Sequence, residues 1–176
     1  DEEIGSPTSK DLIVDLGRAA KHVLVTEPAR EGGKIVVARK GAVRYEVTTH
    51  GEASHAGARH GDGRSAIKEM AHVILKLEAL TDYARGTTCN VGLIKGGTGT
   101  NVVPAKCWIK VDIRIADMAA LDEVEAYVAA IQPEDPDVRI EITGGLDRPP
   151  YERDSGIDAL FEQAKAVAAD IGWELE

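Results

Sequence analysis

The chain has 176 residues, of which 43% are hydrophobic and 29% are charged, and its formal net charge is −9. This net negative charge argues against a nucleic-acid partner, because phosphate binding needs clustered lysine and arginine. No apolar run approaches the ~20 residues that span a membrane. The two cysteines have no CxxC spacing, which favours reduced thiols and a cytoplasmic location.

The first 40 residues predict pieces of an α/β body. The chain begins with three carboxylates, Asp1-Glu2-Glu3. A helix is expected next, with Ser9 as its N-cap. Short strands are expected at 22–26, where an apolar run ends at Glu27, and at 34–39. Because ligands bind at the carboxyl ends of strands in open α/β sheets, Glu3 and Glu27 are candidates for one edge of one sheet.

From residue 41 the pattern becomes that of an antiparallel sheet covered by helices. Alternating apolar and polar residues predict strands at 42–48, 87–95, 101–115 (interrupted by Pro104) and 138–142. Apolar residues at helical spacing predict helices at 65–80, with Ile67, Met70, Ala71, Ile74 and Leu77 in its stripe, and at 119–131, capped by Asp117. This order is the split βαβ arrangement, an α+β fold with a four-stranded antiparallel sheet and two helices on one face.

The flanking segments predict a second body, into which this compact domain is inserted. Lys40-Gly41 and Arg148-Pro149-Pro150 resemble the two crossings between the bodies, and another helix is expected over 157–171. We therefore expect residues 1–40 to be a fragment of an α/β catalytic domain. Residues 41–145 are expected to form a lid and dimerisation domain, and residues 146–176 to start the returning catalytic segment.

Five short motifs follow one another along the chain. They are Asp1-Glu2-Glu3-Ile4-Gly5-Ser6, Glu27-Pro28 after an apolar run, Ala53-Ser54-His55-Ala56-Gly57, Asn101-Val102-Val103-Pro104-Ala105 and Val111-Asp112-Ile113-Arg114. Taken together, they resemble the zinc-dependent aminoacylase and carboxypeptidase family of dinuclear metallopeptidases, above all its glutamate carboxypeptidase branch. Their order and spacing agree over essentially the whole chain.

The resemblance implies metal chemistry for the acidic motifs. Glu2 corresponds to the general base that takes a proton from a metal-bridging water, and Glu3 and Glu27 correspond to ligands of the two zinc ions. A neighbouring carboxylate suits this role because metal binding acidifies the water. Cobalt or manganese also fits sites built from carboxylate and histidine.

The resemblance also implies substrate contacts from the lid. His55 corresponds to a histidine that the lid presents to the active site, in dimers usually that of the other subunit, where it donates a hydrogen bond to the developing oxyanion. Asn101 and Arg114 correspond to residues that hold the C-terminal carboxylate of the substrate, which suits a guanidinium fork. Structural alternatives stay open: Asn101 as a turn cap, and Arg114 paired with Asp112 or Glu46.

Parts of the family's metal site are missing from the sequence, namely a His-x-Asp motif and a bridging aspartate before Glu2, and a final histidine. We therefore expect a central fragment of a hydrolase that cleaves an amide bond next to a free carboxylate, in small peptides or N-acyl amino acids. The parent subunit would bind two Zn²⁺, whereas the fragment would retain none and be inactive. A homodimer through the lid is expected. The alternative is a stand-alone, non-catalytic dimerisation or ligand-binding module.

Overall fold

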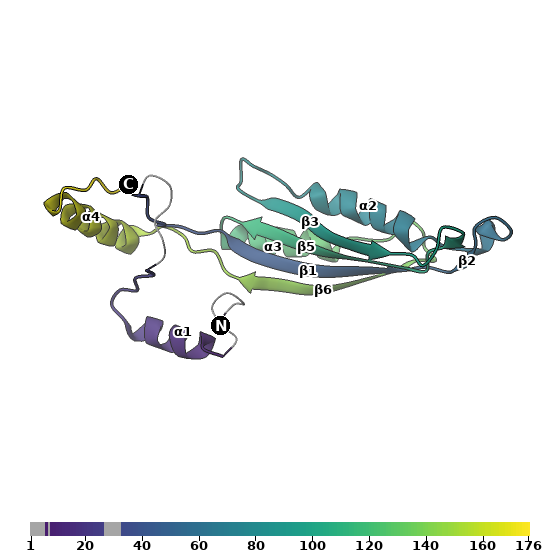
Figure 1. Ribbon diagram of the computed structural model, residues 1–176, viewed down its shortest axis with the longest axis horizontal. Coiled ribbons are helices and arrows are strands. Elements are labelled where there is room, and N and C mark those ends of the chain that lie inside the picture. The colour runs from purple at the N-terminus through teal and green to yellow at the C-terminus, as the bar shows by residue number, and fades with distance from the viewer. Residues whose placement is uncertain (1–5, 7, 27–32) are drawn as a thin grey trace.

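The computed structural model describes residues 6, 8–26 and 33–176 (Figure 1). The helices are α1 (Lys10–Ala19), α2 (Ala66–Glu78), α3 (Met118–Ala129) and α4 (Ser155–Asp170), with a 3-10 turn, η3 (His60–Asp62). The strands are β1 (Gly41–His50), β2 (Ser54–His55), β3 (Thr88–Gly96), β4 (Val102–Val103), β5 (Lys106–Ile115) and β6 (Arg139–Arg148). No helix in these described ranges is long and apolar enough to cross a membrane.

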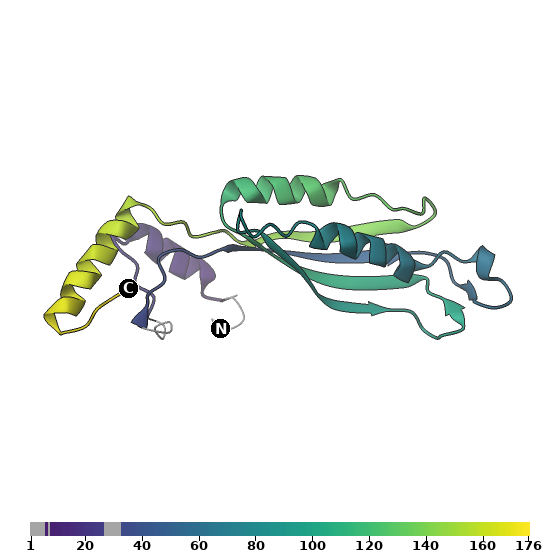
Figure 2. The same cartoon turned by 90° about the horizontal axis from the view of Figure 1, so that it is seen from above.

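The body of the molecule is a four-stranded antiparallel sheet in the order β3-β5-β1-β6. Both α2 and α3 lie over one face of this sheet, and the other face is open (Figure 2). The segments that carry α1 and α4 lie beyond one end of the sheet, and the small β2–β4 pair lies at the opposite end. The predicted split βαβ architecture is therefore confirmed.

Alternation along the strands decides which face is buried. On β1 and β5, Val43, Val47, Ile109 and Ile113 have no exposed surface, because they pack against the helices. The residues between them point to the open face and are largely charged. Burial of such side chains stabilises the fold by ~1.5–3 kcal/mol each, before the entropy cost of ordering them.

Helix α2 turns a different face to the core than its sequence predicts. The predicted stripe included Ile67, which is 42% exposed, whereas Val73 is fully buried. Polar anchors set this orientation. The Ala66 amide donates to the Pro104 carbonyl at 2.8 Å, and the Glu69 carboxylate is buried against a loop.

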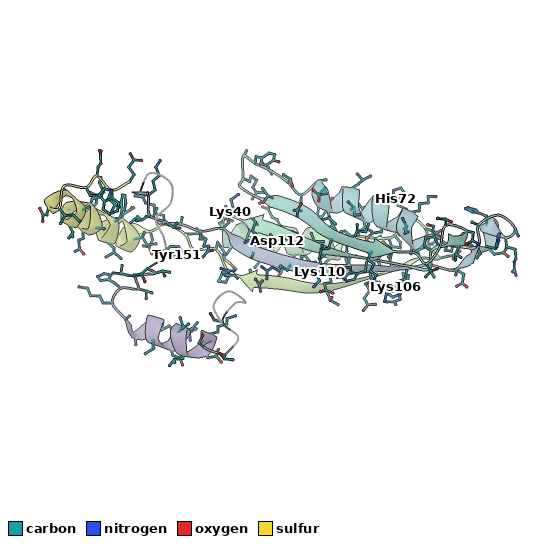
Figure 3. The ribbon with its side chains drawn as sticks, in the orientation of Figure 1. Lys40, His72, Lys106, Lys110, Asp112 and Tyr151 are labelled. Carbon is teal, nitrogen blue, oxygen red and sulfur yellow. The ribbon has the colours of Figure 1, made fainter. Side chains whose placement is uncertain are left out.

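The two strands predicted near the N-terminus are wrong. Residues 22–26 and 34–38 form no strand, and Val25 in the first segment is 79% exposed. A strand requires backbone partners, and within the described ranges the second segment finds one only at its end. There Arg39 and Tyr151 exchange backbone hydrogen bonds of 2.7 and 2.8 Å, which join the two crossings (Figure 3).

The last strand and the long strand also differ from their predictions. The strand expected over 138–142 continues to Arg148, because Gly144 and Gly145 adopt positive φ angles and do not close the unit. The segment 101–115 forms two strands, β4 and β5, because Pro104 lies between them and has no N–H to donate.

Glu69 ties α2 to the loop before β6. It is 2% exposed, and its carboxylate accepts the backbone N–H groups of Glu134 (2.8 Å) and Asp135 (3.1 Å). We expect Glu69→Ala to lower the free energy of unfolding by ~2 kcal/mol, because two backbone donors lose their partner. Urea denaturation measures the loss. Glu134→Ala removes only an exposed ion pair with Lys76 and should cost less than ~1 kcal/mol; equal losses would refute the assigned role of Glu69.

The two cysteines lie in β3 and β5 and are not joined. Cys89 is opposite Ile113 and Cys107 is opposite Gly96, so the thiols lie towards different ends of the strand pair. Burial, helped by the charges of Glu78 and Asp112, raises the pKa of Cys89 to about 12. Burial also raises the pKa of Cys107.

Raised thiol pKa values predict slow modification of the folded chain. At pH 8 the folded state holds less thiolate than the unfolded state, and thiolate is the reactive species. We expect both cysteines to react with a chromogenic disulfide reagent on the order of 100-fold more slowly in the folded chain than in denaturant. Rapid reaction of two thiols in buffer without denaturant would contradict this burial.

Candidate functional site

The site nearest to completion is the tip of the sheet, farthest from α1 and α4 (Figure 2). The tip loop leaves β1 and is pinned at two levels. Glu52 and Arg64 exchange backbone hydrogen bonds of 2.9 Å, and β2 pairs with β4 so that His55 stands opposite Val102. This pairing gives a Gly-rich loop a fixed backbone at His55.

The imidazole of His55 is oriented by its own loop. Its Nδ1 accepts hydrogen bonds from the backbone N–H groups of Gly57 and Ala58, both at 3.1 Å. A ring nitrogen that accepts two N–H groups carries no proton, so the neutral ring carries its proton on Nε2. The side chain is exposed, which leaves the Nε2–H group able to donate to a developing oxyanion.

Asn101 lies beside His55 at the same tip. Its carbonyl accepts the Ala56 N–H at 2.9 Å, which joins the loop of His55 to the start of β4. The turn before it is closed by the backbone, from Val102 N–H to the Gly99 carbonyl at 3.3 Å. The exposed Asn101 side chain is therefore not what closes this turn.

Arg114 lies near the other end of β5 and pairs with Asp112. Its Nε donates to Oδ1 at 2.5 Å and its Nη2 donates to Oδ2 at 3.1 Å. Of the two structural partners considered for Arg114, the sheet uses Asp112. Glu46 instead accepts from Lys110 (2.8 Å) and from the Trp108 indole (3.1 Å), and these bonds lower its pKa.

The two parts of the candidate site are far apart within one chain. Arg114 lies eight residues beyond Lys106, the first residue of β5 on the tip side, so it is roughly 26 Å along the strand. Figure 3 labels Lys106 towards the tip and Asp112 towards the other end. One small substrate therefore cannot contact both His55 and Arg114 of the same chain.

The predicted catalytic base and metal ligands, Glu2, Glu3 and Glu27, lie outside the described residues. Among the residues that are described, no group of three or more His, Cys, Asp or Glu side chains is placed to hold a metal ion. These residues alone do not fit a dinuclear zinc site, and no chemical step through a metal is derived from them.

Sequence reasoning missed two kinds of contact. The first is the pair of backbone N–H groups at Gly57 and Ala58, which fix the His55 ring. The second is Arg44, which stands directly opposite Asp112 in the β1–β5 register. A Gly-rich loop after a histidine is a weak signal for the first, and alternation places Arg44 on the open face. The register of two strands separated by more than 50 residues has no local signal.

Comparison with known proteins decides what this arrangement belongs to. Residues 37–136 match the model of the peptidase dimerisation domain. The chain belongs to this peptidase family. The resemblance carried by the five motifs, to the zinc-dependent metallopeptidases, is thereby confirmed.

The relatives of this peptidase family include several hydrolases. Carboxypeptidase G2 of a Pseudomonas species is 31% identical over 99% of this chain and 43% of its own length. Acetylornithine deacetylase of Myxococcus xanthus is 39% identical over 65% of this chain and 32% of its own length. The solved aminopeptidase PepT of Bacillus cereus aligns with a TM-score of 0.64 and 25% identity, covering 85% of this chain and 40% of its own. The chain thus spans less than half the length of these relatives.

Proposed function

We propose that this chain is the central part of a longer metal-dependent hydrolase, which cleaves an amide bond next to a free carboxylate in small peptides or N-acyl amino acids. The observation that carries the proposal is His55, whose ring is held with Nε2–H outward at an exposed tip, in a chain of the peptidase family. Relatives named as carboxypeptidase G2 and as a p-aminobenzoyl-glutamate hydrolase support a glutamate-like substrate.

The division of labour follows from the residues. His55 donates to the oxyanion, and Asn101 and Arg114 bind the substrate carboxylate. Glu2 stays the proposed general base, and Glu3 and Glu27 stay proposed ligands of two zinc ions, with cobalt or manganese as alternatives. The proposed domain division is 1–40, 41–145 and 146–176, and the buried, unpaired thiols support a cytoplasmic location.

We propose that the complete site needs two chains. Because His55 and Arg114 lie at opposite ends of the sheet, a homodimer with antiparallel lids brings the tip of one chain to the Arg114 end of its partner. The edge strand β3 and helix α2 offer a surface for this contact. Its apolar side chains are exposed by 42–71%: Ile67, Leu75, Leu93 and Ile94.

A charge in this surface should abolish the dimer. We expect the wild-type chain to have twice its 18.8 kDa mass by light scattering, about 38 kDa, and Ile94→Asp to be monomeric. The matched control is Leu146→Asp on the opposite edge strand, β6, which should stay dimeric. Dissociation by the control alone would move the interface to β6.

Expression of the whole reading frame tests the activity. The product should hydrolyse p-aminobenzoyl-L-glutamate or another N-acyl-L-glutamate, lose activity with a chelator and regain it with Zn²⁺, Co²⁺ or Mn²⁺. Absence of hydrolysis of any N-acyl amino acid or dipeptide by the metal-loaded product would favour the alternative, a non-catalytic dimerisation or ligand-binding module.

A further inference from the structure

The open face of the sheet carries a row of alternating charges that ends at Arg114. Arg114 pairs with Asp112, Asp112 also accepts from Arg44 Nε at 3.4 Å, and Arg44 Nη1 reaches Asp147 at 3.1 Å. We infer that Asp112, itself held by Arg44, is a positioning residue that fixes the guanidinium of Arg114 for a substrate carboxylate. This inference rests on the proposed function of Arg114.

The strand geometry explains why these side chains meet. Asp112 and Arg114 are two residues apart on β5 and therefore point to the same face. Arg44 stands directly opposite Asp112, while the small Ala42 stands opposite Arg114. The guanidinium thus has a carboxylate on one side and no large β1 side chain directly across from it.

The donor inventory shows which edge of the guanidinium stays free. Arginine has five N–H groups, and Asp112 engages those of Nε and one of Nη2. Three N–H groups remain, and they lie on the edge formed by Nη1 and Nη2. This edge can bind a second carboxylate in a bidentate manner. Asp112 therefore occupies one side of the fork and leaves the end-on side for the ligand.

The charge balance keeps Arg114 attractive to an anion. One carboxylate, Asp112, is shared between two guanidinium groups, so it offsets only part of the charge on Arg114. The Asp112 side chain is 34% exposed and that of Arg114 is 42% exposed, so the pair contributes little to stability. Loss of Asp112 should consequently disturb the orientation of Arg114 much more than the fold.

Side-chain NMR of the 176-residue chain tests the positioning directly. The Nε–Hε group of Arg114, assigned with Arg114→Lys, should show the heteronuclear NOE of a rigid group, and Asp112→Asn should remove most of that NOE. Asp112→Glu should restore part of it. Glu46→Gln, which breaks the ion pair with Lys110 on the same face of the same strands, should leave it unchanged. A mobile Arg114 in the wild type, or a rigid one in Asp112→Asn, would overturn the inference.

Steady-state kinetics of the whole reading frame separates this inference from the function on which it rests. Asp112→Asn should raise KM for N-acyl-L-glutamate about tenfold with little change in kcat, while Glu46→Gln leaves KM unchanged. An unchanged KM in Arg114→Lys would refute carboxylate binding by Arg114, whatever the NMR result. A raised KM in Arg114→Lys with an unchanged KM in Asp112→Asn would refute the positioning role alone, and so would an equal rise in KM in Glu46→Gln.

Discussion

The Gly144→Ala variant is expected to lose most of its stability. Gly144 lies in β6 opposite Tyr45, with a φ angle of +118°. A Cβ atom there would lie 2.1 Å from the Arg44 carbonyl oxygen, which is rigid backbone of the neighbouring strand. To relieve this overlap β1 and β6 must separate, with loss of ladder hydrogen bonds. We expect the free energy of unfolding, measured by urea denaturation, to fall by at least ~3 kcal/mol.

The adjacent glycine provides the matched control. Gly145 also has a positive φ angle, +143°, but nothing lies within 4 Å of a Cβ placed there. Gly145→Ala therefore introduces backbone strain without overlap and should cost ~1–2 kcal/mol. If the two variants unfold at the same urea concentration, strain alone explains the first result and the close approach of Gly144 to β1 is refuted.

The second large effect is expected at His55. In the product of the whole reading frame, His55→Ala should lower kcat by roughly 10²–10³, because it removes a donor to the charge that develops in the transition state. KM should change much less, since the oxyanion is absent in the ground state. Steady-state kinetics with an N-acyl-L-glutamate measures both constants.

His60 is a fair control for this loss, because it is an exposed histidine in η3 of the same loop. His60→Ala should keep kcat within about twofold of the wild type. A loss of kcat in His60→Ala equal to that in His55→Ala would indicate damage to the loop. An unchanged kcat in His55→Ala would remove His55 from the catalytic machinery.

The lid was predictable because its sequence pattern and its packing agree. Alternation in 42–48 and 101–115 and helical spacing in 119–131 report burial against one common core, and the structure has that core. The exception is α2, where the tie from Glu69 to the loop before β6 selects the buried face. Such a contact joins residues 65 apart in the chain, and no local pattern records it.

The first arm was predicted less well for a related reason. Residues 22–26 have the composition of a buried strand, but strand formation depends on neighbouring backbone that composition does not specify. Within the described ranges that neighbour is absent, and Val23, Leu24 and Val25 are exposed. Sequence pattern thus indicates what a segment can bury, and tertiary context decides whether it does.

The candidate site divides in the same way. The motifs pointed to His55, Asn101 and Arg114 one at a time. They could not show that His55 and Asn101 share a tip while Arg114 lies near the other end of the sheet, because that depends on register. Nor could they show the Arg44–Asp112–Arg114 row, which joins residues on two strands paired across the middle of the sheet.

A site completed by two chains is the central claim, and mixing inactive subunits tests it most directly. Whole-length His55→Ala and Arg114→Ala subunits should be denatured together, refolded and assayed. If His55 of one chain serves the site that uses Arg114 of the other, half of the dimers are mixed and each contains one intact site. The account then predicts recovery of roughly a quarter of wild-type kcat. No recovery above the separate variants, with mixed dimers demonstrated by mass spectrometry, would contradict the account.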